Sequence, residues 1–281
     1  MADKLESLLK DPSYSEPIIE LEDVHVTFKT RTGPVLNPNK VKAVRGVSLK
    51  LMPGKTIGIV GESGCGKSTT ANVMCGLQAP TEVRVFFKGH DVTKRTNEDR
   101  KIMGRVISVV FQDPATALNA RMSVHDQLID PLMVHKIGTM EEREARVMDL
   151  IQMVGLPSSV LDALPGQLSG GQRQRVAIAR ALSLSPDAII ADEPTSALDV
   201  SVRAQILNLL TDLKKELNLA MVFISHDIMS VRYVSDEIIV MNHGNIIEQG
   251  TPDEICNHPK DPYTKKLLGA APSLLEPPEE D

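Results

Sequence analysis

The fold of this chain is decided by residues 61–69, which read Gly61-Glu62-Ser63-Gly64-Cys65-Gly66-Lys67-Ser68-Thr69. The apolar run 56–60 before this stretch predicts a short buried strand, and the residues after it predict a helix that ends near Gly76 and Pro80. A strand, a glycine-rich turn and a helix with the spacing G-x4-G-K-[ST] form the pattern of a phosphate-binding loop. The alternative is a glycine-rich turn that matches the pattern by chance, and the flanking strand and helix argue against it.

Each residue type in such a loop has a role in binding phosphate. Glycines let the backbone turn tightly enough to aim successive N–H groups inward, and the helix that starts there adds its positive dipole end. Lys67 is expected to reach the β- and γ-phosphates of a nucleotide, and the Ser68 hydroxyl is expected to bind Mg²⁺. All nine residues 61–69 are therefore predicted to form a nucleotide site.

Composition limits the class of protein. A chain of 281 residues with net charge −6 holds one large domain or two modest ones and has no basic surface suited to nucleic acid. No apolar run approaches the roughly 18 residues of a membrane span, and the charged N-terminus has no signal-peptide core. We expect a soluble, cytosolic protein. Cys65, Cys75 and Cys256 form no CxxC pair and are expected to be reduced thiols.

Strand patterns occupy both ends of the chain. Residues 18–28 alternate with a slip at Asp23, which predicts a bulge or a turn, and further strands are predicted at 43–51, 83–87, 105–111, 188–191, 220–225 and 238–241. An amphipathic helix lies between 191 and 220, so the flanking strands are expected to pair in parallel in a covered sheet. Residues 242–245 predict a hairpin turn, and residues 1–17 a flexible tail.

The middle of the chain has a different character. Residues 113–184 contain little strand signal, whereas 140–154 carries a clear apolar helical face and 124–133 a weaker one. This block is interpreted as a helical insert within the sheet domain.

Two acidic residues follow the strand 188–191. We predict that Asp192 orients Mg²⁺ beside the phosphate-loop strand, and that Glu193 polarises the attacking water as general base. Gln112 follows the strand that ends at Phe111, and its amide oxygen is a candidate ligand of Mg²⁺ or of the water. His226 follows the strand 220–225 and is a candidate contact of the γ-phosphate. Considered alone, Gln112 is better explained as a capping or surface residue, and His226 as a hydrogen-bonded polar group.

A second glycine segment reads Leu168-Ser169-Gly170-Gly171-Gln172. Ser169 and Gln172 have the spacing of a capping box at the head of a helix predicted over 173–184, so an ordinary capped helix is one reading. The other reading is a second site for phosphate oxygens at a helix N-terminus. One chain would have two phosphate-binding segments if the second binds the nucleotide of a neighbouring molecule. A dimer would then enclose each nucleotide between two different segments.

Six motifs occur together in this sequence: the phosphate loop, Gln112, residues 168–172, residues 188–193, Ser196-Ala197-Leu198-Asp199 and His226. In this combination they resemble the ATP-binding subunit of an ABC transporter over about residues 18–255. The resemblance implies an α/β fold, with a P-loop NTPase (RecA-like) core, an antiparallel β-subdomain and an inserted α-helical subdomain. It implies that Phe28 stacks on adenine and that Gln112 couples the site to a membrane partner. It also implies that Asp199 communicates across the dimer, that His226 is a switch histidine, and that residues 168–172 bind the ATP of the partner subunit.

The C-terminal part of the sequence resembles a smaller group within this family. Glu248-Gln249-Gly250 and the run HPKDPYTKKLL at 258–268 are similar to the tail of oligopeptide and dipeptide importer ATPases, so 256–281 is predicted as a tail of that type. This implies ATP and Mg²⁺ as cofactors and a place on the cytoplasmic face of the membrane. The implied partners are a second, non-identical ATPase chain, two permeases and, indirectly, an extracytoplasmic binding protein. Some relatives carry an iron–sulfur tail, but only Cys256 lies there, so no cluster is expected.

Other functions stay open at this point. Similar subunits serve nickel and oligosaccharide uptake. A soluble DNA-repair or chromosome ATPase shares the motif set but typically inserts a long coiled coil, and only about 50 residues without sustained heptads separate Gln112 from Ser169 here. Translation-associated relatives normally carry two ATPase units in one chain, and exporters are often fused to their membrane domain. A non-hydrolysing nucleotide switch is a further alternative.

Overall fold

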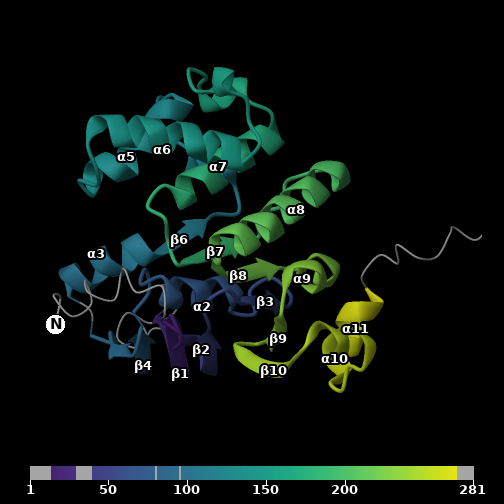
Figure 1. Ribbon diagram of the computed structural model, residues 1–281. Helices are drawn as coiled ribbons and strands as arrows, with labels where there is room; N and C mark the ends of the chain where they lie inside the picture. The colour runs from purple at the N-terminus through teal and green to yellow at the C-terminus, as the bar shows by residue number, and fades with distance from the viewer. Residues whose placement is uncertain (1–13, 30–39, 80, 95, 271–281) are drawn as a thin grey trace, which may run out of the picture.

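The computed structural model describes residues 14–29, 40–79, 81–94 and 96–270. Figure 1 shows helices α5, α6 and α7 gathered on one side of the molecule, strands β1, β2 and β4 on the opposite side, and the larger sheet between them. Residues 1–13 of the predicted N-terminal tail and residues 271–281 of the predicted C-terminal tail lie outside the described residues.

A six-stranded sheet forms the centre, in the order β10-β9-β3-β8-β7-β6. Five strands run parallel, and β10 turns back antiparallel to β9 through His243 and Gly244. The predicted parallel pairing of 188–191 with 220–225 and the hairpin turn are therefore confirmed. The strands are β3 Thr56–Val60, β6 Ile107–Val110, β7 Ala188–Asp192, β8 Ala220–Ser225, β9 Glu237–Asn242 and β10 Asn245–Gly250.

One expectation about this sheet is wrong. The strand that carries Asp192, β7, does not lie beside the phosphate-loop strand β3, because β8 lies between them. Ser68, which follows the loop at the start of α2, nevertheless meets Asp192, because the loop carries it past the end of β8.

A smaller antiparallel sheet has the order β2-β1-β4-β5. The register between β1 and β2 shifts between Leu21 and Val24, and Asp23 there has a φ of 49° and donates its N–H to Ser48 Oγ at 2.8 Å. The slip at Asp23 is thus a bulge within one strand, and not a turn between two. The strands are β1 Ile19–Lys29, β2 Lys40–Leu51, β4 Glu82–Phe87 and β5 His90–Asp91.

Helices make up the rest of the described elements. Every element between residues 113 and 184 is helical, as predicted. The helices are α2 Lys67–Met74, α3 Asn97–Val106, α4 Pro114–Ala117, α5 Val124–Val134, α6 Met140–Met153, α7 Gly170–Leu182, α8 Val200–Leu217, α9 Ile228–Val234, α10 Pro252–Asn257 and α11 Pro262–Gly269, with short 3-10 turns η1 Ser158–Val160 and η2 Pro165–Gln167.

Two predicted boundaries are corrected. The strand expected over 105–111 starts only at Ile107, because Thr96 and Asp99 form a capping box that begins α3 and carries the helix through Val106. The helix expected over 173–184 starts at Gly170 and ends at Leu182, because Ser169 is its N-cap and both glycines lie in its first turn.

The central sheet is buried on both faces. Along β8, Met221 and Phe223 belong to the apolar cluster beneath the helices, whereas Val222 and Ile224 belong to the cluster shared with the small sheet. Successive side chains of a strand point to opposite faces, so a strand covered on both sides reads as a continuous apolar run. This double burial explains why 220–225 lacks alternation. Among the described residues, no helix is both long and apolar enough to cross a membrane.

The helical group contains a pH-dependent contact. His125 on α5 places Nε2 2.8 Å from Glu144 Oε2 on α6, and Nδ1 3.3 Å from Asp126 Oδ1. The hydrogen bond to Glu144 raises the pKa of His125 above its usual value, against the opposing effect of partial burial. A raised pKa in the folded state means that the contact stabilises the protein below the unfolded pKa of about 6.5, and that this contribution is lost as the pH rises through the folded pKa.

We therefore expect His125→Gln to lower the free energy of unfolding at pH about 5.5, and to have little effect at pH about 9, where the wild-type imidazole is neutral. Urea unfolding of both proteins across this pH range measures the difference. Glu144→Gln removes the same charge pair and serves as the matched variant. A destabilisation that stays constant with pH would show that His125 acts through packing alone.

Candidate functional site

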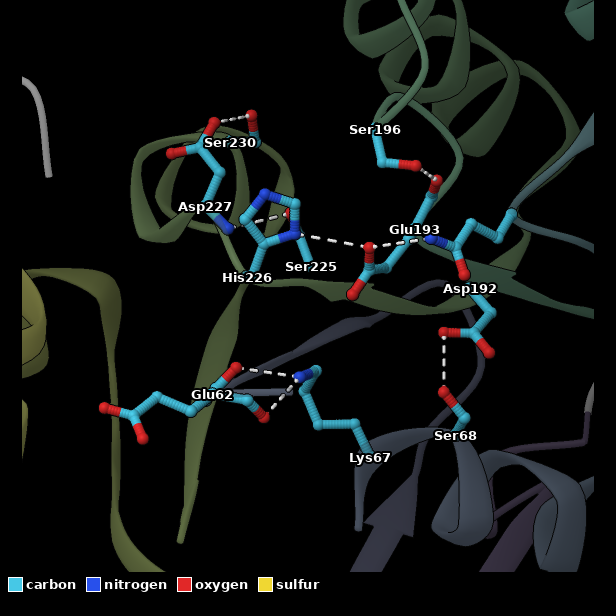
Figure 2. Close-up of polar contacts among 12 residues, drawn as sticks. Glu62, Lys67, Ser68, Asp192, Glu193, Ser196, Ser225, His226, Asp227 and Ser230 are labelled. Carbon is cyan, nitrogen blue, oxygen red and sulfur yellow. Dashed lines mark hydrogen bonds and ion pairs between the residues drawn. The ribbon is translucent and has the colours of Figure 1, made fainter. Parts of the chain in front are cut away.

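Part of the predicted site comes together at the carboxyl edge of the parallel strands, where Figure 2 shows Glu62, Lys67, Ser68, Asp192, Glu193 and His226. The phosphate loop follows β3, Asp192 ends β7 with Glu193 after it, and His226 follows β8. Gln112 lies two residues beyond the end of β6. In open α/β sheets this edge is where ligands bind, because the loops that leave the strands converge there.

The loop has the geometry that phosphate binding requires. Gly66 has a φ of 111°, and a Cβ on it would lie 2.5 Å from the carbonyl oxygen of Ala43, so only glycine fits. Lys67 opens α2, is 5% exposed, and donates from Nζ to Gly61 O at 2.7 Å and to Glu62 O at 3.0 Å. Because both acceptors are neutral carbonyls, the ammonium charge and the helix N-terminus remain available to an anion.

Ser68 and Asp192 face each other across this edge. Ser68 Oγ donates to Asp192 Oδ1 at 3.2 Å. Burial raises the pKa of the Asp192 carboxyl, and the hydrogen bond from Ser68 opposes that effect. A hydroxyl and a carboxylate oxygen are hard ligands of the type that Mg²⁺ prefers, and Mg²⁺ commonly keeps several waters and substrate oxygens beside one or two protein ligands. The pair therefore fits such an ion. Within the described chain, no group of three His, Cys, Asp or Glu side chains is arranged to hold a metal without other ligands.

Glu193 is the meeting point of the predicted catalytic residues. Its Oε2 accepts from Gln112 Nε2 at 3.3 Å. The same oxygen lies 3.2 Å from His226 Nδ1, as Figure 2 shows, so Gln112 and His226 share one carboxylate oxygen of Glu193. Gln112 and His226 come from opposite sides of β7, since the sheet order is β8-β7-β6. The arrangement holds the carboxylate at the sheet edge where ligands bind, and the role of Glu193 as general base stays a prediction.

The backbone of Glu193 is strained. Its φ is 47°, a region that non-glycine residues rarely adopt and that costs on the order of 1–3 kcal/mol. Two contacts keep it there: its N–H donates to Ile224 O at 2.9 Å, and Ser196 Oγ donates to its carbonyl at 3.1 Å. Strain of this kind that is held by surrounding structure is frequent at functional positions.

Gln112 is predicted to bind either Mg²⁺ or the attacking water, and the contact that it makes in the site is with the residue predicted to activate that water. Its hydrogen bond joins it to Glu193, and no hydrogen bond within the described part of the chain joins it to Ser68 or Asp192. The structure thus brings Gln112 to the predicted base, while its role as a metal ligand stays a prediction.

The second glycine segment forms a complete capping box. Gln172 N donates to Ser169 Oγ at 3.3 Å, and Ser169 N donates to Gln172 Oε1 at 2.9 Å. Packing against α8 also favours glycine at position 171, because a Cβ there would lie 2.7 Å from Val202 Cγ1. Both residue ranges, 61–69 and 168–172, are described, and no hydrogen bond or ion pair joins them. Binding of a partner subunit's ATP by residues 168–172 stays a prediction.

Two residues singled out by the resemblance lie apart from this cluster. Phe28 is 40% exposed near the end of β1, where it pairs with Val41 of β2. Asp199 is the N-cap of α8, accepting from Val202 N and from Ser201 Oγ, both at 2.9 Å, and these bonds lower the pKa of its carboxyl. Adenine stacking by Phe28 and communication by Asp199 stay predictions.

The sequence analysis missed a contact to the loop from the far end of the chain. Tyr263 on α11 accepts a hydrogen bond through its hydroxyl from Glu62 N at 2.9 Å, and Lys266 Nζ lies 3.6 Å from Glu62 Oε1. The run at 258–268 indicated only a class of relatives. Nothing in its spacing relates it to residues 61–69, which lie about 200 positions away.

Comparison with known proteins extends the picture. A family model described as ABC transporter matches residues 44–196. The dipeptide transport ATP-binding protein DppF of Escherichia coli (strain K12) is 43% identical over 265 residues, covering 94% of this chain and 79% of that protein. The oligopeptide transport ATP-binding protein AppF of Bacillus subtilis (strain 168) is 46% identical over 259 residues, covering 92% and 79%.

Solved structures agree with the fold. A dimeric ATP-binding cassette in a post-hydrolysis state, bound to ADP and Pi, superposes with a TM-score of 0.74 at 32% identity and covers 83% of this chain and 98% of its own. The fold is thus the predicted one: the central sheet with its phosphate loop is the P-loop NTPase core, the antiparallel sheet is the β-subdomain, and the helical group is the helical part. The chain belongs to the ABC transporter family, as an ATP-binding subunit.

Proposed function

We propose that this chain is the ATP-hydrolysing subunit of an importer for peptides at the cytoplasmic face of a membrane. The observation that carries the hydrolytic part is the single oxygen of Glu193 shared by Gln112 and His226, at the same edge as the Ser68–Asp192 pair. The peptide part is supported by relatives named for dipeptide and oligopeptide transport, whose match covers more than nine-tenths of this chain. Nickel or oligosaccharide uptake is the alternative cargo, and a soluble DNA-repair ATPase the alternative class.

The residues divide the work of phosphoryl transfer. Lys67 and the N–H groups at the start of α2 bind the phosphate oxygens of ATP, and Ser68 and Asp192 hold Mg²⁺, which when bound supplies charge neutralisation. Glu193 orients the attacking water and takes its proton. Gln112 and His226 keep the Glu193 carboxylate aimed at that water, because they hold it from both neighbouring strands.

The second glycine segment completes the site of another subunit. Ser169, Gly170, Gly171 and Gln172 lie at the N-terminus of a 13-residue helix and make no hydrogen bond to residues 61–69 of their own chain. We propose that they bind the ATP held by a second, non-identical ATPase chain. The dimeric state of the related cassette bound to ADP and Pi supports such an arrangement.

A groove beside Gln112 offers a place for the permeases. It has a volume of about 310 Å³ and lies between β6, the end of α2 and helices α5 and α7. Phe111 and Leu77, which line it, are 46% and 66% exposed, whereas large apolar side chains are normally covered. An apolar groove next to a residue that holds Glu193 suits a segment of a membrane partner, because movement there reaches the catalytic carboxylate directly.

Replacing Glu193 with Gln tests the catalytic assignment. The amide cannot take a proton, so we expect ATP turnover to fall at least about a hundredfold, in line with the loss of a general base. ATP binding should be retained, and the variant should remain associated with its partner ATPase in the presence of ATP. Phosphate release and size-exclusion chromatography of the co-expressed chains give the two readouts. Unchanged hydrolysis would reject Glu193 as the base.

Replacing Leu77 with Ser tests the groove. Loss of an exposed apolar side chain that the partner would cover is expected to weaken co-purification with the permeases about tenfold, which corresponds to about 1.4 kcal/mol. ATP binding by the isolated subunit should not change, since Leu77 lies outside the phosphate loop. Met140→Ser is the matched control, because Met140 is 54% exposed on α6 and does not line the groove. Equal recovery of the permeases with both variants would place the membrane contact elsewhere.

A further inference from the structure

The C-terminal helix α11 is fixed to the central sheet before it reaches the phosphate loop. Tyr263, Leu267 and Leu268 pack against the larger apolar cluster. Figure 1 shows α10 and α11 together at the end of the molecule where β10 forms the edge of the sheet. The helix is therefore part of the packed domain, although it follows the last strand of the sheet.

The start of α11 is held from β10. Glu248 accepts from Lys260 N through Oε1 at 2.8 Å, and from Asp261 N through Oε2 at 3.1 Å. Asp261 in turn caps α11 by accepting from Tyr263 N at 2.7 Å. Hydrogen bonds from backbone N–H groups to a carboxylate are among the stronger ones in proteins, so the position of Tyr263 is set relative to the sheet.

From there the side chain of Tyr263 reaches the loop. Its hydroxyl accepts from Glu62 N at 2.9 Å, and the carbonyl of the same residue accepts from Lys67 Nζ at 3.0 Å. Both backbone groups of Glu62 are thereby held by side chains, one from the loop itself and one from the C-terminal helix. The Glu62 carbonyl also accepts from Cys65 N of the loop at 3.3 Å. Lys67 is assigned to phosphate, so Tyr263 is the side chain on Glu62 that has no other assigned task.

We propose that Tyr263 is a positioning residue for the phosphate loop, its hydroxyl fixing the peptide group of Glu62 so that the loop is preformed for nucleotide. The inference rests on the assignment of residues 61–69 as the nucleotide site. It gives the C-terminal run at 258–268 a physical task within the subunit, in addition to marking a class of relatives.

The ion pair between Lys266 and Glu62 does not account for the positioning of the phosphate loop. Lys266 and Glu62 approach to 3.6 Å, but their side chains are 76% and 61% exposed. Solvent-exposed ion pairs contribute little, because water screens the charges and ordering two long side chains costs entropy. The hydroxyl of Tyr263 is the group that the proposal depends on.

Cys65 provides a readout that needs no nucleotide. It lies in the loop, is 5% exposed, and burial raises the pKa of its thiol, so it should react slowly with iodoacetamide while the loop is closed. Looser positioning of Glu62 exposes this thiol more often. Peptide mass spectrometry separates modification at Cys65 from modification at Cys75 and Cys256.

Tyr263→Phe removes the acceptor and keeps the ring. We expect Cys65 to be alkylated about three- to tenfold faster without nucleotide, and equilibrium affinity for ATP to fall by a similar factor, the range of one neutral hydrogen bond. Tyr233→Phe is the matched control, because Tyr233 is 59% exposed and its hydroxyl bonds Asn208, away from the loop. Lys266→Ala should resemble wild type. If Tyr263→Phe matches Tyr233→Phe in both measurements, or if Lys266→Ala alone reproduces the effect, the proposal is overturned.

Two further variants separate the possible failures. Glu248→Ala removes the acceptor of Lys260 N and Asp261 N and should also speed alkylation of Cys65; no change there would refute the link through β10. Lys67→Ala tests the site itself, and it should abolish ATP binding. If Lys67→Ala binds ATP normally, the nucleotide site is wrongly assigned. If it loses binding while Tyr263→Phe behaves as wild type, only the role of Tyr263 is rejected.

Discussion

The whole arrangement depends on the burial of the central sheet on both of its faces. Strands that are covered on both sides by helices and by a second sheet are joined by crossover connections and run parallel, so their carboxyl ends meet at one edge. Each of the functional segments lies at or within two residues of the carboxyl end of one of these strands: the phosphate loop, Gln112, Asp192 with Glu193, and His226. A site made from four separated parts of the sequence is therefore a result of strand direction, which is set by the crossover connections that also cover the sheet.

At the carboxyl edge of the sheet, local hydrogen bonds oppose the unfavourable effects of backbone strain and of burial. Glu193 occupies a left-handed backbone conformation, and its carbonyl, N–H and carboxylate are each held by a neighbour. Asp192 is kept partly out of water, which disfavours its charge, while the Ser68 hydroxyl favours it. Such a site is preorganised: the protein has already met the cost of orienting its polar groups before ATP arrives.

Much of this was predictable from the sequence, because the decisive signals are local. The spacing of residues 61–69, the capping-box pair Ser169 and Gln172, and the apolar runs of β3, β7 and β8 each depend on neighbours in the chain. The order of the strands did not follow from such signals, and Asp192 was expected beside β3 although β8 separates them. The start of β6 was misplaced because the capping of α3 by Thr96 outweighs the strand preference of Arg105 and Val106. The contact between Tyr263 and Glu62 spans 201 positions, and no pattern in the sequence reports a distance of that kind.

The hydrogen bond from Glu62 to Tyr263 has a practical consequence for work with this subunit. The C-terminal helix resembles an appendage when the chain is divided by motif, since every nucleotide-binding motif ends by His226. A shortened version that stops after β10 would keep all of those motifs and still lose a support of the phosphate loop. Affinities measured on such a minimal domain, or on a fusion that pulls on α11, would describe a loop with one of its anchors missing, and not the loop of the intact subunit.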